Sequence, residues 1–527
     1  MAALDPATRS ELRPGDVDLS DPSTFAAGVP HDYFRVLREE APVQWQEECE
    51  IPVFLPGPGY WALTRYEDIV FVSKHPEIFS SAVGTSALNE VRPLERSMAR
   101  EQLIQMDPPG HTELRTLMNA QFKPRAVLET EAQLHKIVSE TLDGLEGRSE
   151  CDFVDAVSAP ISLRMLTNFL GVPDRHTHRF YRWTNDIMSF GEPGVANLLR
   201  ARLALLQIFV QSAMLARARR KTPAPDAFSR LVNGEYNGKP LSRMMIQINF
   251  FLLIIAGNET TRNALSGGIQ ALCEHPEQLD KLRRDPSLLP HAIEEILRWV
   301  TPVMQFRRTA LRDTRIGDQE IKQGEKVVMY YGAANRDPRV FENPEVFDIT
   351  RKPNPHIAFG TGTHFCMGSH IAKLEMRVTL EEFLRRFPKI SLLGPPERLF
   401  VGASSDVNNA SVVLRLVYGD FSFLLASDIF AAEEAGIVSR GAPLDSDILK
   451  VPHHGSRTSS SVRFLEGVSP AVAVISVGQD NRYGHPHPET VEALRRHVAG
   501  GMLFLTSESG TIEFVTDGTR LEVKTER

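Results

Sequence analysis

Apolar residues recur at helical spacing along most of residues 31–387. Apolar positions at i, i+3, i+4 and i+7 form one face of an amphipathic helix that packs on a core. This spacing predicts helices at 31–40, 66–74, about 124–147, 159–170, within 174–220, at 243–272 and from Ser369 to about Phe387. Runs with alternating or β-branched character predict strands at 59–64, 306–310 and 324–331. We therefore expect this region to be mainly helical with small sheets.

The longest of these helical segments has a polar interruption at its centre. Arg243–Leu272 contains the string Ala256-Gly257-Asn258-Glu259-Thr260-Thr261. These residues are costly in a buried helix, because threonine hydroxyls compete for backbone carbonyls and glycine loosens the turn. We expect a break or kink here, either with a chemical function or as a simple threonine-lined bend.

The character of the chain changes near residue 401. From there it is rich in glycine, histidine and β-forming residues, with strands predicted at 411–416, 421–425 and 471–477. We predict one domain at 1–403 and a second segment at 404–527.

Composition narrows the class of protein. The chain has 527 residues and a net charge of −8, so a nucleic-acid-binding surface is not expected. Its four cysteines lie far apart without paired spacing, which is typical of a reducing cytoplasm. The N-terminal residues lack the pattern of a signal peptide. The longest apolar run, near Phe250–Ala256, is too short to span a bilayer, so we predict a cytoplasmic protein without a membrane span.

A loop with three glycines and one cysteine precedes the last predicted helix of the first domain. It reads Phe359-Gly360-Thr361-Gly362-Thr363-His364-Phe365-Cys366-Met367-Gly368. The N-terminus of the following helix would direct N–H groups at the sulfur and favour a thiolate. No general-base His–Asp pair flanks the cysteine, so a soft, redox-active metal suits it better than acyl transfer. A buried structural cysteine is the plain alternative.

This loop resembles the haem-binding signature of the cytochromes P450. Met367 is the minor departure, since leucine is commoner there. The resemblance implies the mainly α cytochrome P450 fold, haem b as cofactor, and Cys366 as the axial thiolate ligand of the iron. It also places Phe359, Gly360 and Gly368 in the cofactor-binding loop.

Other motifs extend the resemblance. The string at 256–261 matches the family's oxygen-activating motif, which implies that Ala256 and Gly257 face the cofactor. By the same resemblance Thr260 hydrogen-bonds dioxygen and Glu259 relays protons. The haem propionates would be bound by a further set of residues: His111, Arg115, Arg308 and His364. A surface His/Arg pair is the alternative for His111 and Arg115.

Glu295 and Arg298 lie at i and i+3 and can pair on one helix. In the family this pair is structural and is completed by an arginine from a later loop. Val346 stands where many relatives have that arginine, and Arg351 is expected to supply the charge instead.

The resemblance implies a monooxygenase that inserts one oxygen atom from O2 into a C–H bond of a small lipophilic substrate. A sterol, a branched lipid, a fatty acid or a terpenoid would fit. No flavin or nicotinamide domain is evident, so electrons are expected from a ferredoxin and ferredoxin reductase. Basic residues after the loop could contact an acidic ferredoxin or be ordinary solvated surface: Lys373, Arg377, Arg385 and Arg386.

Residues 404–527 resemble the C-terminal part of a metallo-β-lactamase-fold domain of the type attached to bacterial DNA-uptake channel proteins. By this resemblance, four residues would be remnants of a metal site: Asp428, His453, His454 and His485. The upstream H-x-H-x-D-H cluster that supplies most metal ligands there is missing. We therefore predict a partial α/β domain in which zinc is not expected, and solvated loop histidines are the alternative.

Two other functions stay open from the sequence. The C-terminal segment could be a metal-dependent hydrolase or nuclease, although the missing ligand cluster opposes this. The first domain lacks the β-hairpin that usually ends the family's fold, so the chain could bind haem with impaired turnover.

Overall fold

The computed structural model describes residues 12–25, 28–49, 54–55, 57–146, 150–188, 195–394, 414–426, 429, 434, 437–438, 443–457, 459–478, 485–498 and 502–526. The chain forms two compact units, Met1–Ser404 and Ser405–Arg527. Each unit is described here by itself.

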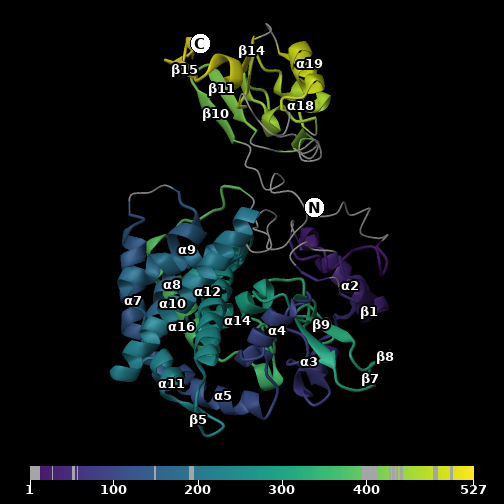
Figure 1. Cartoon of the computed structure of the whole chain (residues 1–527), viewed down its shortest axis with the longest axis vertical. Helices are drawn as coiled ribbons and strands as arrows, with labels where there is room; N and C mark the ends of the chain where they lie inside the picture. The colour runs from purple at the N-terminus through teal and green to yellow at the C-terminus, as the bar shows by residue number, and fades with distance from the viewer. Residues whose placement is uncertain are drawn as a thin grey trace. The chain divides into compact units, whose positions relative to one another are not determined.

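The first unit is dominated by helices (Figure 1). The α-helices are α2 His31–Glu40, α3 Tyr66–Lys74, α4 Pro93–Ala99, α5 Gly110–Met118, α6 Pro124–Leu128, α7 Glu131–Asp143, α8 Ala159–Phe169, α9 Thr177–Met188, α10 Val195–Lys221, α11 Ala227–Asn233, α12 Arg243–Glu274, α13 Pro276–Arg284, α14 Leu289–Val300, α15 Tyr331–Ala334 and α16 Ser369–Arg386. Short 3-10 or π turns lie between them: η1 Pro22–Phe25, η2 Leu103–Gln105, η3 Asn119–Phe122, η4 Val154–Ser158, η5 Asp174–His176, η7 Pro286–Leu288 and η8 Gly362–His364.

Small sheets complete the first unit. The largest has the order β1-β2-β9-β6-β3, and its strands are β1 Val43–Gln46, β2 Tyr60–Leu63, β3 Phe79–Ser80, β6 Gln305–Ala310 and β9 Lys326–Tyr330. Two hairpins stand apart from it: β4 Glu235–Tyr236 with β5 Lys239–Pro240, and β7 Thr314–Ile316 with β8 Gln319–Ile321. The predicted strands at 59–64, 306–310 and 324–331 correspond to β2, β6 and β9.

Helix α12 is the central helix of the bundle, in contact with α8, α10, α14 and α16. It begins at the N-cap Ser242, whose side chain accepts a hydrogen bond from Met245 N at 2.9 Å. Glycines allow the neighbouring helices to approach closely. A Cβ on Gly257 would lie 2.8 Å from Leu166 of α8, and one on Gly268 would lie 2.8 Å from Ile296 of α14.

The break expected at the centre of this helix is wrong. α12 is continuous over 32 residues from Arg243 to Glu274. The Thr260 hydroxyl donates to the Ala256 carbonyl at 2.7 Å, four residues back, so the polar group is satisfied without opening the helix. Contacts with α8 and α14 hold the glycine-containing stretches in helical form.

Helix α10 is more apolar than we expected of any helix in this chain. The segment Leu199–Lys221 of α10 is long and apolar enough to cross a membrane by length and composition alone. The apolar run near Phe250–Ala256, by contrast, lies within α12 in the core.

The second unit contains a five-stranded sheet of order β10-β11-β12-β13-β14. Its strands are β10 Leu414–Tyr418, β11 Phe421–Leu425, β12 Ile448–Lys450, β13 Val472–Ile475 and β14 Met502–Leu505. β10 is antiparallel to β11, and the remaining pairs are parallel. The other described elements are η10 Pro452–Gly455, α18 Val462–Val468, α19 Pro488–His497, α20 Thr506–Ser509, β15 Ile512–Thr516 and β16 Leu521–Thr525. The unit has its own apolar core, which includes Leu449, Phe464 and Leu494.

A carboxyl group is buried between two helices of the first unit. Glu375 of α16 accepts a hydrogen bond from Ser162 Oγ of α8, and no other hydrogen bond to its carboxyl group occurs in the described residues. Burial raises the pKa of Glu375 to about 8, from its ordinary value of 4.5. The folded protein therefore holds this proton between about pH 4.5 and 8, whereas the unfolded chain releases it.

This linkage predicts a pH-dependent effect of Glu375→Gln. The wild-type protein loses stability as the pH rises through that window, by about 1.4 kcal/mol per pH unit, and the amide does not titrate. We expect the difference in unfolding free energy, variant minus wild type, to increase from pH 5 to pH 8 in denaturant titrations. Glu381→Gln on the exposed side of α16 is the matched control. A difference that stays constant with pH would contradict the assignment.

Candidate functional site

The cysteine loop is a tight turn that leads into α16. Gly360 and Gly362 have φ angles of +68° and +67°, a region that glycine adopts without strain. A Cβ on Gly362 would lie 2.3 Å from the Ser73 carbonyl oxygen, because α3 closes over the loop. Cys366 N donates to the Phe359 carbonyl at 2.8 Å and ties the two ends of the loop together. The shape of the backbone therefore explains the glycines.

The environment of the Cys366 sulfur contains opposing influences. Burial raises the pKa of the Cys366 thiol, while a backbone hydrogen bond from Gly368 and the charge of Arg115 lower it. The backbone N–H of the loop and the charge of Arg115 therefore favour the thiolate, while the cost of desolvating the anion opposes it. A bound metal cation would reverse the balance, since a coordinating thiol is deprotonated.

Helix α5 brings His111 and Arg115 to the cysteine loop. Arg115 Nη2 donates to the Phe365 carbonyl at 2.6 Å. His111 is 1% exposed, and both of its ring nitrogens are buried without a hydrogen-bond partner. Its ring lies 4.3 Å from that of His364, centroid to centroid. Two orphaned nitrogens on one buried imidazole are costly unless a ligand provides an acceptor.

His364 and Arg308 complete a group of donor side chains. His364 Nε2 lies 3.1 Å from the Met106 carbonyl and 3.2 Å from Ser81 Oγ. Arg308 of β6 is 5% exposed and donates to the Arg307 carbonyl at 2.7 Å. Burial, followed by neighbouring positive charge, lowers the pKa of His364 to about 2.

The pKa of His111 is also lowered. Its pKa falls to about 4 through burial and then the charge of Arg115, and the nearby Asp107 opposes the shift. Ser80 Oγ and Ser81 N both donate to Asp107, so this carboxylate is already engaged. The group His111, Arg115, Arg308 and His364, which we name the donor cluster, is therefore poor in acceptors.

The middle of α12 contributes a different surface. Ala256 is exposed although it lies halfway along a core helix, and the Thr260 hydroxyl is bonded to its carbonyl. Gly257 faces Leu166 of α8 and so serves the packing of two helices. Burial raises the pKa of Glu259, and the charge of Arg262 opposes the rise.

Sequence reasoning missed Arg262. Its guanidinium pairs with Glu259 Oε2, while Glu259 Oε1 is buried without a partner. The two residues are i and i+3 on one helix, a spacing that could have suggested the pair. Arg262 thus orients the carboxylate of Glu259.

Glu295 and Arg298 form a buried pair in which both side chains have no exposed surface. Arg298 Nη2 lies 2.7 Å from Glu295 Oε1. Arg351 Nε lies 3.1 Å from Glu295 Oε2, so Arg351 supplies the second arginine. The Val346 carbonyl accepts from Arg351 Nη2 at 2.7 Å, so this position contributes its backbone rather than its side chain.

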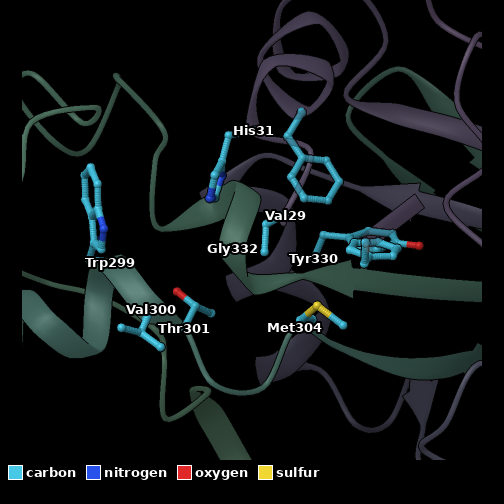
Figure 2. Close-up of a pocket in the computed structure, with 10 residues that line it drawn as sticks. Val29, His31, Trp299, Val300, Thr301, Met304, Tyr330 and Gly332 are labelled. Carbon is cyan, nitrogen blue, oxygen red and sulfur yellow. The ribbon is translucent and has the colours of Figure 1, made fainter. Parts of the chain in front are cut away.

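A separate pocket lies where the start of α2 meets the end of α14 and strand β9. Figure 2 shows its lining, which is mostly apolar: Phe25, Val29, His31, Phe34, Trp299, Val300, Thr301, Met304, Tyr330 and Gly332. None of the residues of the donor cluster or the cysteine loop belongs to it. The titratable side chains of this lining are His31 and Tyr330.

In the second unit three histidine rings gather. The His485 ring lies 5.6 Å from that of His453 and 5.0 Å from that of His487. His454 Nδ1 lies 2.5 Å from the Ser476 carbonyl. Asp428 is outside the described residues. Within the described part of the chain, no three His, Cys, Asp or Glu side chains are arranged to hold a metal ion.

Comparisons with known proteins identify the family. Residues 197–392 match the family model described as Cytochrome P450. The methyl-branched lipid omega-hydroxylase of Mycobacterium bovis is 37% identical over 69% of this chain and 86% of its own length. The steroid C26-monooxygenase of Rhodococcus jostii is 35% identical over 77% of this chain and 86% of its length.

A solved structure agrees with this result. Cytochrome P450 CYP268A2 of Mycobacterium marinum, in complex with pseudoionone, has a TM-score of 0.68 and 37% identity, covering 72% of this chain and 94% of that one. The chain belongs to the cytochrome P450 family and is a monooxygenase. The family implies a haem-iron cofactor.

The residues of the site fit such a cofactor. Haem carries two carboxylate groups, and the donor cluster lacks acceptors of that kind. The exposed surface of Ala256 on α12 offers a place against a flat ring, and Cys366 is a suitable thiolate ligand. The orphaned nitrogens of His111 are the observation on which this fit depends most.

The donor cluster predicts opposite effects of His111→Leu on stability and on cofactor retention. Removing two unsatisfied nitrogens should stabilise the haem-free protein by about 1–3 kcal/mol in denaturant titrations. Loss of a carboxylate donor should make haem transfer to an acceptor apoprotein faster. His135→Leu, on an exposed face of α7, is the control and should change neither. The account would be refuted if the His111 variant were less stable than the wild type without haem and released haem at the same rate as the wild type.

Proposed function

We propose that this monooxygenase binds haem b through Cys366 and inserts one oxygen atom from O2 into a C–H bond of a small lipophilic substrate. When bound, thiolate-ligated haem iron supplies the activation of O2. The observation that carries the proposal is the donor cluster, which gathers four donor side chains from three separate parts of the chain beside Cys366.

The donor cluster would hold the two carboxylates of the cofactor. Arg308 and Arg115 provide fixed positive charge, and the arginine fork suits a carboxylate in a site shielded from water. His111 and His364 are neutral imidazoles that can each donate one N–H. Phe359, Gly360 and Gly368 would shape the loop around the sulfur, as the hydrogen bond from Cys366 N to Phe359 O supports.

Residues in the middle of α12 would deliver protons to the site. Thr260 presents its hydroxyl next to the exposed Ala256 and can donate or accept once it leaves the Ala256 carbonyl. Glu259 is a half-buried carboxyl group whose pKa is raised by burial, and a carboxyl group in such a position can take up and release protons. Arg262 is a positioning residue that holds one oxygen of Glu259 and leaves the other free to take part.

Glu295, Arg298 and Arg351 have a structural role. Glu295 Oε2 accepts from Asn354 Nδ2 at 3.1 Å, and its Oε1 accepts from Asp348 N at 2.9 Å. Arg298 also donates to the Asn335 carbonyl at 2.9 Å. The triad thereby fastens α14 to the chain that leads to the cysteine loop, which is why Cys366 can be held in place.

Electrons would come from a ferredoxin and its reductase in the cytoplasm. The four basic residues suggested for docking are each already paired with an acidic one: Lys373 with Glu294, Arg377 with Glu131, Arg385 with Glu382 and Arg386 with Asp143. Their charges are largely compensated, so they would contribute little to the attraction of an acidic partner.

The substrate class follows from the relatives. Proteins named for a methyl-branched lipid and for a steroid, and one solved with pseudoionone, share 35–37% identity with this chain. Sterols, branched lipids, fatty acids and terpenoids are therefore the substrates to test first. These compounds have few charged groups, which suits oxidation of an unactivated C–H bond.

The C-terminal unit would be a partial metallo-β-lactamase-like domain without hydrolytic activity, joined to a P450 domain at about residues 403–404. The clustering of His453, His485 and His487 supports a common ancestry of these loops. Two or three histidines alone would hold zinc weakly. Metal-dependent hydrolysis is thus the weaker candidate, and a haem protein with impaired turnover is the outcome to distinguish from the proposed enzyme.

Replacing Thr260 tests the proposed function. With a heterologous ferredoxin and reductase and a panel of a sterol, a branched fatty acid and a terpenoid, the wild-type protein should give hydroxylated product. Thr260→Ala should retain haem and oxygen consumption but release hydrogen peroxide in place of product, because a proton donor is lost. Product and peroxide are measured by mass spectrometry and a peroxidase assay.

Thr261→Ala is the matched control, since Thr261 is the next residue and is buried away from the Ala256 surface. It should keep the wild-type ratio of product to peroxide. Unchanged product yield in Thr260→Ala would refute the assigned role. Wild-type protein that consumes oxygen without any product from the panel would favour the impaired haem protein.

A further inference from the structure

The outer face of α10 carries a continuous apolar stripe. Five large side chains lie at helical spacing and are 49–62% exposed: Leu199 59%, Leu203 56%, Leu206 58%, Val210 49% and Met214 62%. At 1.5 Å per residue the stripe is about 22 Å long. Scattered exposed leucines are ordinary on protein surfaces, but five aligned on one helix mark a surface that is covered by something.

This stripe is not needed to pack α10 in the fold. The opposite face of the helix is buried and consists of small or apolar residues that contact α9, α11 and α12: Ala201, Ala204, Ile208, Ser212 and Ala216. Figure 1 shows α10 beside α12 in the helical bundle. The helix is therefore apolar on both faces, which explains why Leu199–Lys221 resembles a membrane span by composition.

The charges on α10 are all of one sign. The helix contains no acidic residue and six basic ones, in a protein whose net charge is −8. Arg219 pairs with Asp226, whereas the other five are exposed and form no ion pair within the described residues: Arg200, Arg202, Arg217, Arg220 and Lys221. They lie at both ends of the stripe and along its edge.

A second copy of the chain is a poor occupant for this face. In an antiparallel pair of α10 helices, Arg217, Arg220 and Lys221 of one copy would face Arg200 and Arg202 of the other. In a parallel pair each basic group would face its own equivalent. Like charges meet in both cases, with no acidic residue on the helix to compensate them.

We propose that the outer face of α10 binds the surface of an anionic lipid membrane. The five apolar side chains enter the boundary between headgroups and acyl chains, and the flanking arginines and lysine contact the anionic headgroups. The inner face of α10 stays packed on the bundle, so the helix lies on the membrane and does not cross it. This inference does not depend on the haem site or on the identity of the substrate.

Vesicle binding by the full-length haem protein tests the proposal. Sedimentation or flotation compares vesicles of phosphatidylglycerol and phosphatidylcholine in equal parts with vesicles of phosphatidylcholine alone. We expect binding to the anionic vesicles to be about tenfold tighter or more, and to weaken between 0.05 and about 0.5 M NaCl as the charges are screened.

Two variants separate the apolar and charged contributions. Leu203→Gln with Val210→Gln and Met214→Gln should lower binding to anionic vesicles by about tenfold or more. Arg200→Gln with Arg202→Gln and Arg217→Gln should remove the preference for anionic over neutral vesicles. The matched control replaces exposed apolar side chains elsewhere, Leu128→Gln with Val462→Gln, and should bind like the wild type. Haem content and unfolding temperature verify that each variant is folded.

Several outcomes would overturn the proposal. The proposal is wrong if the wild-type protein does not bind anionic vesicles. It is also wrong if the folded stripe variant binds them as tightly as the wild type. A concentration-dependent dimer in light scattering that the stripe variant abolishes would assign the face to a second copy. Failure here would leave the monooxygenase activity and the Thr260 test unaffected.

Discussion

Burying several hydrogen-bond donors in one place is unfavourable unless an acceptor shares the space, and the first unit of this protein is built around such a place. His111, Arg308 and His364 come from a helix, a strand and a loop that are far apart in sequence. His111 and Arg308 are buried and His364 is partly buried, and both nitrogens of His111 lack a partner. Asp107 is engaged by two serines and cannot satisfy them all. A ligand with two carboxylates resolves this imbalance, which is why the fold and the cofactor belong together.

The same reasoning applies to the sulfur ligand. The glycines of the cysteine loop and the N-terminus of α16 shape a site for Cys366, in which burial raises the pKa of the thiol. A metal cation would add to the positive charge of Arg115 and stabilise the thiolate further. Under the proposed function, haem binding would complete both the donor cluster and the cysteine site and would contribute to the stability of the whole unit.

Local spacing in the sequence predicted much of this arrangement. His111 and Arg115 at i and i+4, and Glu295 and Arg298 at i and i+3, share a helix face in any α-helix, so their proximity needs no knowledge of the fold. The valine at position 346 was also interpretable, because Arg351 lies five residues further along the chain, and the structure pairs it with Glu295.

Features set by long-range packing were not predictable in this way. The continuity of α12 depends on its contacts with α8 and α14, and the close approach of Gly257 to Leu166 cannot be read from either segment. The buried Glu375 needs Ser162, which lies more than two hundred residues away. The exposed stripe of α10 was hidden for a related reason. A helix that is apolar on two faces has no periodicity to show which face is buried.

The absorption spectrum of the dithionite-reduced, carbon monoxide-bound full-length protein tests the central claim most directly, with Cys366→Ser and Cys273→Ser as variants. The account predicts a strongly red-shifted Soret band in the wild type and in Cys273→Ser, because Cys366 binds the haem iron as a thiolate. Cys366→Ser should lose that band. An unshifted band in the wild type, or a red-shifted band that survives in Cys366→Ser, would contradict it.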